Sequence, residues 1–294
     1  LDVSANTALT VLYCYYNQLT ALDVNANTAL QTLACYGSSP TSSHGVTNQI
    51  TALDVSNNTA LTYLHCGTNQ ITELDVSNNT ALTSLYCYYN QLTSLDVSGS
   101  TALTTLYCYG NQLTSLDVSA NTALTGLRCE YNQLTSLDLS ENTGLTDLRC
   151  GNNQLTSLDL SSNPDLLILI MWSNQISSLD LNNNSALQNL YCGSNQLTSL
   201  DVSNTSLNIF NCTSNQLTYL NVKGLEDQLN TFTAVDNSLT CIETLDPSWA
   251  TENWTYANGN IDEGVIFSVI CGSEDQDVWY VATTGSDGSG NGTQ

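Results

Sequence analysis

The chain has 294 residues, with 27 Asp and Glu against 3 Lys and Arg, and a formal net charge of −24. So few cations exclude a nucleic-acid reader, because neutralising phosphates takes clustered Lys and Arg, and an anionic membrane surface would repel the chain as well. No apolar run reaches the roughly 18 residues that a membrane-spanning helix needs. We therefore expect no nucleic-acid partner and no direct insertion into a membrane.

A repeat of 21 residues runs with few breaks from Leu1 to about Leu220, and the largest break is an insertion of ten residues between Cys35 and Asn48. Three successive copies, LTSLYCYYNQLTSLDVSGSTA, LTTLYCYGNQLTSLDVSANTA and LTGLRCEYNQLTSLDLSENTG, align over residues 82–144 without a gap. In the first copy, Leu85 and Cys87 alternate with outward residues, which is the period-2 pattern of a half-buried strand. Such a coil buries its apolar side only against copies of itself, so we expect the repeats to stack into a parallel solenoid.

The repeat LxxLxCxxNxLxxLDVSxNTA, in about eleven copies over some four fifths of the chain, resembles the leucine-rich repeats of secreted bacterial proteins. The resemblance implies a leucine-rich-repeat right-handed solenoid that is mostly β. A parallel sheet would line its concave face, and the convex side would be extended or 3₁₀. The Asn of each NQ pair should bond through its side-chain amide to backbone groups of its own coil and the next.

Nine of the eleven cysteines occupy one inward position per coil, where Met171 and Ala234 also occur. A position that accepts Met or Ala needs apolar volume, so we interpret these thiols as reduced packing groups. Their parallel Cβ directions oppose a disulfide, and a single file cannot surround zinc. The nine residues are Cys14, Cys35, Cys66, Cys87, Cys108, Cys129, Cys150, Cys192 and Cys212.

Cys241 and Cys271 lie outside the repeat, in a segment that resembles the C-terminal caps of secreted bacterial leucine-rich-repeat proteins. A disulfide between them would hold together a cap too small for its own core. This pair is the main reason to expect an extracellular or cell-surface location. We therefore divide the chain into a solenoid over 1–240, a cap over 241–271, and a linker with the start of a further domain over 272–294.

Both ends of the chain carry an expectation. Leu1 opens in the middle of the repeat, so we expect a fragment or a processed form. The last residues, WYVATTGSDGSGNGTQ, resemble the opening of a pectate-lyase-like parallel β-helix domain.

The outward positions of the strand segment hold twelve of the fifteen tyrosines. Tyr suits both stacking on sugars and hot spots of protein interfaces, although ladders of rings also serve merely to stabilise a sheet. Arg128 and Arg149 either bind an anionic ligand or form a self-neutralising cluster with Glu130 and Asp147. The expected ligand-binding residues are Tyr86, Tyr88, Tyr89, Tyr107, Tyr109, Arg128, Tyr131, Arg149, Trp172 and Tyr191.

One Asp per coil recurs on the opposite edge, at the start of the Asp-Val/Leu-Ser segment. Stacked carboxylates repel one another, and hydrogen bonds from turn amides and from the Ser two residues on are the simplest offset. The alternative is calcium bridging between coils, at Asp75, Asp96, Asp117 and Asp138. No other cofactor is expected.

No Ser, Cys, His and carboxylate group stands at catalytic spacing, so we do not expect an enzyme. The favoured hypothesis is a binding and adhesion module whose Tyr-rich concave face holds a polysaccharide or a protein partner. A second hypothesis is a structural subunit that self-associates head-to-tail into an extracellular filament. A third is a targeting domain of a larger β-helix enzyme that acts on polysaccharides.

Overall fold

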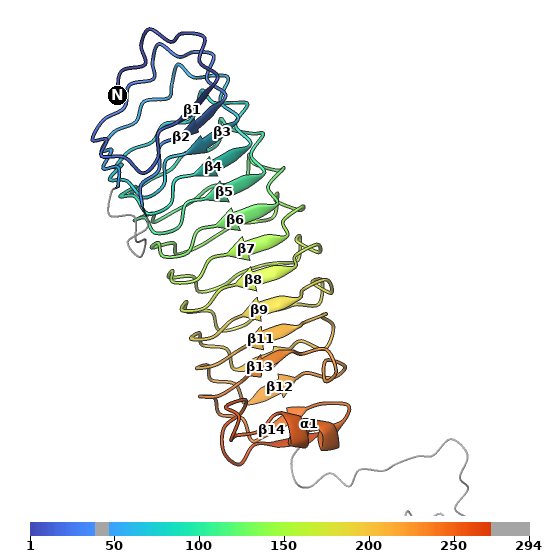
Figure 1. Cartoon of the computed structure of the whole chain (residues 1–294). Coiled ribbons are helices and arrows are strands. Elements are labelled where there is room, and N and C mark those ends of the chain that lie inside the picture. Colours follow the sequence, from blue (N-terminus) through green and yellow to red (C-terminus); the bar gives the residue numbers. More distant parts are fainter. Residues whose placement is uncertain (39–46, 272–294) are drawn as a thin grey trace, which may run out of the picture.

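Each coil contributes one three-residue strand, and eleven such strands stack into a parallel sheet (Figure 1). The computed structural model describes residues 1–38 and 47–271. Neighbouring strands pair in register, with Leu85 opposite Leu106 and Leu106 opposite Leu127. The strands lie in the order β1 (Val11–Tyr13), β2 (Thr32–Ala34), β3 (Tyr63–His65), β4 (Ser84–Tyr86), β5 (Thr105–Tyr107), β6 (Gly126–Arg128), β7 (Asp147–Arg149), β8 (Ile168–Ile170), β9 (Asn189–Tyr191), β11 (Ile209–Asn211) and β13 (Thr231–Thr233). The predicted parallel solenoid is confirmed.

The other side of each coil is extended backbone with two successive tight turns. In one coil, the N–H of Asn79 donates to the carbonyl of Val76, and that of Leu82 to the carbonyl of Asn79, both at 3.0 Å. Residues 1–38 and 47–271 contain no 3₁₀ helix, so the extended form is the one adopted. Only the last coils add strands here, in a sheet of four with the order β10 (Ser199–Asp201), β12 (Tyr219–Asn221), β14 (Cys241–Glu243) and β15 (Ile266–Ser268).

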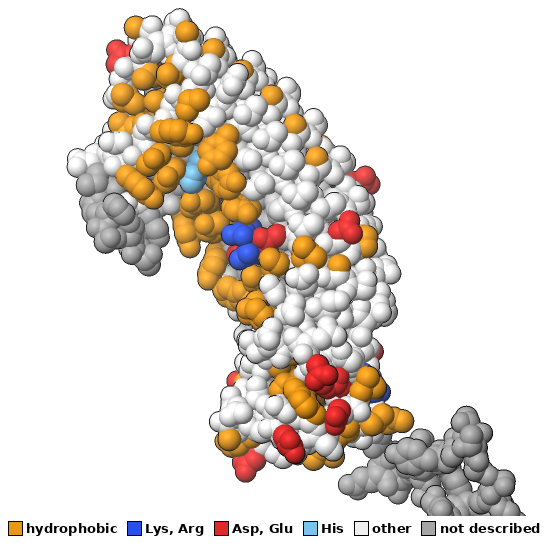
Figure 2. Space-filling view, turned by 45° about the vertical axis from the view of Figure 1, so that its right-hand side comes forward, with side chains coloured by type: hydrophobic (Ala, Val, Ile, Leu, Met, Phe, Trp, Pro, Cys, Tyr) orange, Lys and Arg blue, Asp and Glu red, His pale blue; other side chains and the backbone are white. Residues whose placement is uncertain are grey.

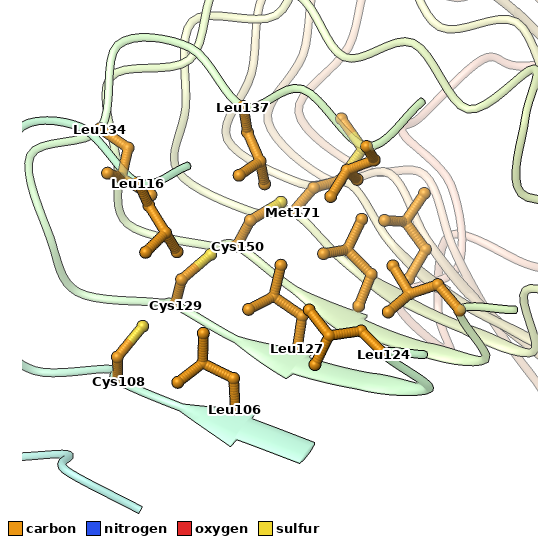
Figure 3. Packing of buried hydrophobic residues seen from close by; sticks show 14 of the residues in the cluster. Leu106, Cys108, Leu116, Leu124, Leu127, Cys129, Leu134, Leu137, Cys150 and Met171 are labelled. Atoms are coloured by element: carbon orange, nitrogen blue, oxygen red, sulfur yellow. The ribbon is translucent and has the colours of Figure 1, made fainter. Parts of the chain in front are cut away.

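Leucines and cysteines from successive coils form one continuous buried core. Figure 3 shows Cys108, Cys129, Cys150 and Met171 following one another through its centre. The nine thiols of the repeat are all unpaired and buried, as predicted. Burial raises the pKa of the Cys66 thiol to about 12, so these groups are neutral packing atoms and not nucleophiles.

A row of asparagines joins each coil to the one before it. The side-chain Nδ2 of Asn90 donates to the carbonyls of Cys66 and Cys87 at 3.1 and 3.0 Å, and its Oδ1 accepts from the N–H of Ile71 at 3.0 Å. Cys66 and Ile71 belong to the preceding coil. The sequence predicted bonds to the coil of the Asn itself and to the next coil, so the second part of that prediction was wrong. The backbone N–H of Cys66 donates to the carbonyl of Tyr86 in the following coil at 2.9 Å. The carbonyl of Cys66 is then left to accept from a side chain of that following coil.

A second row of asparagines, from the NTA part of the repeat, was not anticipated. Asn79 is fully buried and donates from Nδ2 to the carbonyls of Val55 and Asn58 at 3.1 and 2.9 Å. Ser100 occupies the same position one coil later and donates to Val76 and Asn79. The solenoid is therefore held by side-chain amides on both edges as well as by its apolar core.

The segment after β13 closes the last coil. Trp254 packs on Phe232 with ring centroids 4.6 Å apart. It follows α1 (Pro247–Asn253), whose first turn is capped by Asp246. Cys241 forms a disulfide with Cys271, with their Cα atoms 5.8 Å apart. No helix in the described part of the chain has the length and apolar character needed to cross a membrane. The tail over 272–294, with its β-helix resemblance, lies outside the described residues.

Replacing Asn111 by Ala tests the first asparagine row. Its amide bonds to Cys87 O, Cys108 O and the N–H of Leu92, at 3.2, 2.9 and 3.0 Å. Because buried backbone groups lose their partners, we expect the free energy of unfolding to fall by about 2–4 kcal/mol. Urea denaturation measures this. The control Asn78→Ala removes an exposed amide with one bond of 3.4 Å and should change stability by less than about 0.5 kcal/mol. Equal losses in both variants would contradict the role given to the row.

Candidate functional site

The outer surface of the eleven-stranded sheet, called the sheet face here, carries the residues that flank each inward Cys. Figure 2 shows a band of hydrophobic side chains along it, interrupted by one blue patch of cations. The structure places all ten predicted ligand-binding residues on this face. Most are half-buried, and the band divides into a run of rings and a charged cluster.

The run of rings, called the aromatic ladder, extends over the first five coils. Tyr36 stacks on His65 with ring centroids 3.9 Å apart, and Tyr88 stacks on Tyr109 at 4.6 Å and 7°. Tyr15 also stacks on Tyr36, whereas Tyr86 and Tyr107 meet edge-on, so the ladder mixes stacked and edge-on contacts. Its members are Tyr13, Tyr15, Tyr36, Tyr63, His65, Tyr86, Tyr88, Tyr107 and Tyr109.

His65 and Tyr36 were not among the predicted site residues. The Nε2 of His65 lies 3.0 Å from the hydroxyl of Tyr88, and burial lowers the pKa of His65 to about 4. Burial also raises the pKa of Tyr88 to about 12. The contact between His65 and Tyr88 therefore joins two uncharged groups at neutral pH.

Glycines make room for two of the rings. A Cβ on Gly110 would lie 2.4 Å from Cδ1 of Tyr89, and a Cβ on Gly67 would lie 2.9 Å from Cε2 of Tyr88. No other residue fits at Gly110 without moving a ring. The absence of a side chain at Gly67 and Gly110 thus leaves the space that the rings of Tyr88 and Tyr89 occupy.

Three tyrosines of the face have left-handed backbone. Tyr16, Tyr89 and Tyr131 have φ of 52°, 48° and 55°, and their exposed fractions are 40%, 42% and 49%. The position lies two residues after the inward Cys, and other coils fill it with Gly, Asn, Ser, Thr or Asp. Glycine avoids the backbone strain of this conformation and Asn and Asp reduce it, whereas the tyrosines share it with Thr68 and with the serines at the same position.

The charged cluster, Arg128, Glu130, Asp147 and Arg149, lies on β6 and β7 and in the turn after β6. Asp147 accepts from Arg128 Nη2 at 3.0 Å and from Arg149 Nε at 2.9 Å. Arg128 also lies over the ring of Tyr107, 4.4 Å from its centroid. The expected pairing of the arginines with Asp147 is present, whereas the Oε2 of Glu130 is buried without a partner.

Beyond the cluster the aromatic residues are fewer. Trp172 lies edge-on to Tyr131, with centroids 5.5 Å apart, and covers Gly151. Tyr191 makes no ring contact within the described residues. Of these two predicted site residues, Trp172 therefore contacts an exposed tyrosine, whereas Tyr191 contacts no other aromatic ring in the described part of the chain.

The aspartate row lies on the other edge of the solenoid. Asp54 Oδ1 accepts from the N–H of Ser56 at 3.0 Å and from its hydroxyl at 2.6 Å. These hydrogen bonds lower the pKa of Asp54 and supply the offset that the sequence led us to expect. A hollow of about 290 Å³ lies on this edge, lined by Asp138, Asp159 and nearby serines. Among the described residues, no group of three or more His, Cys, Asp or Glu side chains lies close enough together to hold a metal ion.

Calcium bridging along this row is tested by the melting temperature with and without EDTA. Because one serine already satisfies an oxygen of each carboxylate, we expect no change. A clear fall on chelation, restored by added calcium, would support bridging at Asp75, Asp96, Asp117 and Asp138 instead.

Residues 80–121 match the family described as Leucine Rich repeats (2 copies). Comparison with curated proteins gave no match. The functional domain of InlJ from Listeria monocytogenes, which includes a cysteine ladder, is 33% identical with a TM-score of 0.72, over 85% of this chain and 62% of that one. The present chain thus spans about three fifths of that structure.

Two further solved structures share the fold at lower identity. A leucine-rich-repeat protein of Leptospira interrogans is 22% identical with a TM-score of 0.62, over 81% of this chain and 69% of that one. The ectodomain of the plant receptor kinase GASSHO1/SCHENGEN3 from Arabidopsis thaliana, in complex with CASPARIAN STRIP INTEGRITY FACTOR 2, is 19% identical with a TM-score of 0.68, over 90% of this chain and 31% of that one. With the stacked coils, these matches show that the chain has the leucine-rich-repeat fold, and residues 80–121 match the leucine-rich-repeat family.

Proposed function

We propose that this chain is an extracellular binding module whose sheet face holds a protein partner. The carrying observation is the set of three exposed tyrosines, Tyr16, Tyr89 and Tyr131, in left-handed backbone. Residues of several types adopt the same left-handed φ at this position of other coils, so the exposed ring, and not the backbone strain, distinguishes these three coils. Stabilising the sheet does not explain them, because small residues fill the same position in other coils.

The stacking of the ladder favours a protein over a polysaccharide. A sugar ring binds best to an open aromatic face, but the faces of Tyr36, Tyr88 and Tyr109 lie against other rings. Tyr edges and hydroxyls, backed by a rigid sheet, instead match the composition of protein hot spots. That a leucine-rich-repeat ectodomain is found in complex with CASPARIAN STRIP INTEGRITY FACTOR 2 supports the capacity of the fold for such partners.

Two features support an extracellular setting. The Cys241–Cys271 disulfide belongs to an oxidising compartment, and the sequence resembles secreted bacterial repeats. Polysaccharide binding, head-to-tail filaments and the targeting of a β-helix enzyme stay alternative proposals. Light scattering of the intact chain tests the filament.

Replacing Tyr16, Tyr89 and Tyr131 together by Asn tests the proposal. Asn152 fills the equivalent position with φ of 51°, so the variant keeps a residue that tolerates this backbone. Relief of strain offsets the lost ring contacts, and we expect stability to change by about 1 kcal/mol or less for each site. Display of random dodecapeptides and a glycan array are screened with both proteins. We expect peptides that bind the parent chain at least tenfold more tightly than the variant.

The matched control is Tyr256→Asn, which removes a Tyr that is 62% exposed in the cap and should leave peptide binding unchanged. Binding of glycans instead of peptides would move the assignment to a polysaccharide. Peptides that bind all three proteins equally would refute a binding role for the sheet face.

A further inference from the structure

We propose that Arg128, Arg149 and Glu130 form a carboxylate-binding subsite of the sheet face, where an acidic side chain of the protein partner binds together with a proton. The inference rests on the proposed function. It adds the chemistry of one contact and the condition under which that contact forms.

The position of the subsite is set by register. Arg128 on β6 pairs directly with Arg149 on β7, so two cations stand side by side on a chain that has only three and a net charge of −24. Figure 2 shows them as the one blue patch within the hydrophobic band of that view. An anionic group of a partner that covers the band would meet these cations.

The guanidinium groups retain donors for a ligand. Arg128 gives one N–H and Arg149 gives two to Asp147. Of the other seven N–H groups, the Nε–H of Arg128 is buried without a partner, which leaves six for a ligand. The two side chains are 28% and 25% exposed. Contact with the ring of Tyr107 holds Arg128 in place, so a carboxylate can bind to a preorganised pair.

Glu130 is the group that departs from a self-neutralising cluster. If it balanced the second arginine, its carboxylate oxygens would accept their hydrogen bonds. Instead its Oε2 is buried without a partner. Burial raises the pKa of Glu130 to about 7, against the lowering by Arg149 and Arg128. The titratable and charged groups around it are Arg128, Arg149, Asp147, Tyr109, Cys108, Cys129 and Cys150.

The charge of the cluster therefore depends on one proton. With Glu130 neutral, the two arginines and Asp147 give a net charge of +1; with Glu130 ionised, the sum is zero. A bound carboxylate favours the +1 form, so binding raises the pKa of Glu130 and takes up a proton. The affinity for the carboxylate is accordingly highest below pH 7 and falls as the pH rises through that value.

The chain has only two arginines, so its ¹H–¹⁵N spectrum contains just two arginine Nε–Hε signals, and both report on the subsite. The full chain is titrated with a hexaglutamate peptide, with hexaglutamine as the uncharged control, at pH 6 and pH 8. We expect hexaglutamate alone to shift both signals. Its Kd should rise about fivefold from pH 6 to pH 8, which corresponds to a rise of about one unit in the pKa of Glu130 on binding.

The variant Glu130→Gln fixes the cluster at +1 and should bind hexaglutamate equally at both pH values, with the affinity of the parent at pH 6. The pKa of Glu130 in the parent chain, followed by ¹³C carboxyl signals, should rise when hexaglutamate is added; this measurement holds even where the variant is unstable. Arg128→Gln with Arg149→Gln should abolish binding.

Several results would overturn the inference. These are an absence of shifts with hexaglutamate, a Kd in the parent chain that is independent of pH, or pH dependence that persists in Glu130→Gln. Shifts with trigalacturonate but not with hexaglutamate would assign the subsite to an acidic polysaccharide instead. Some peptides could bind through Tyr89 and Tyr131 without shifting the arginine signals. That result would contradict the subsite but would still support the proposed function.

Discussion

Hydrogen bonding between coils of equal length is the constraint on which this structure depends. The N–H of Cys87 reaches Tyr107 O at 2.9 Å, and the N–H of Cys108 reaches Arg128 O at 2.8 Å. Because these bonds join equivalent positions of successive coils, equivalent residues lie about 4.8 Å apart along the stack. The position of a residue within its coil then decides whether it faces the core, the sheet face or the aspartate edge.

Stacking of the coils also places residues of the same type next to one another. The effect of this on stability differs between the surfaces of the solenoid. Tyrosines attract one another as stacked or edge-on rings, so they tolerate the repetition. Carboxylates of the aspartate row repel, and each is held by the amide of the residue two positions on, as Asp75 is by Ser77 at 2.9 Å. Arg128 and Arg149 would repel too, and Asp147 between them removes that repulsion while Glu130 leaves part of the positive charge unbalanced.

What the sequence alone predicts follows from this geometry. The parallel sheet, the buried thiols and the row of NQ asparagines depend only on position in the coil, and the spacing of Leu85, Cys87 and Asn90 is enough to place them. The stack of Tyr36 on His65 crosses between two positions of neighbouring coils, and it depends on side-chain rotamers. The burial of Glu130 Oε2 without a partner depends likewise on the conformations of the surrounding side chains, which the repeat pattern does not determine.

A left-handed residue two positions after the inward side chain recurs in every coil except that of Gly37, so its strain is part of the fold and not of any one residue. A solenoid of many equal coils, each held by its own core leucines and side-chain amides, tolerates a less favourable residue at a few of these turns. Tyr16, Tyr89 and Tyr131 use that tolerance, and their side chains are exposed. Exposed tyrosines that precede and adjoin two arginines along the sheet face are the arrangement that a partner with apolar and acidic groups would recognise.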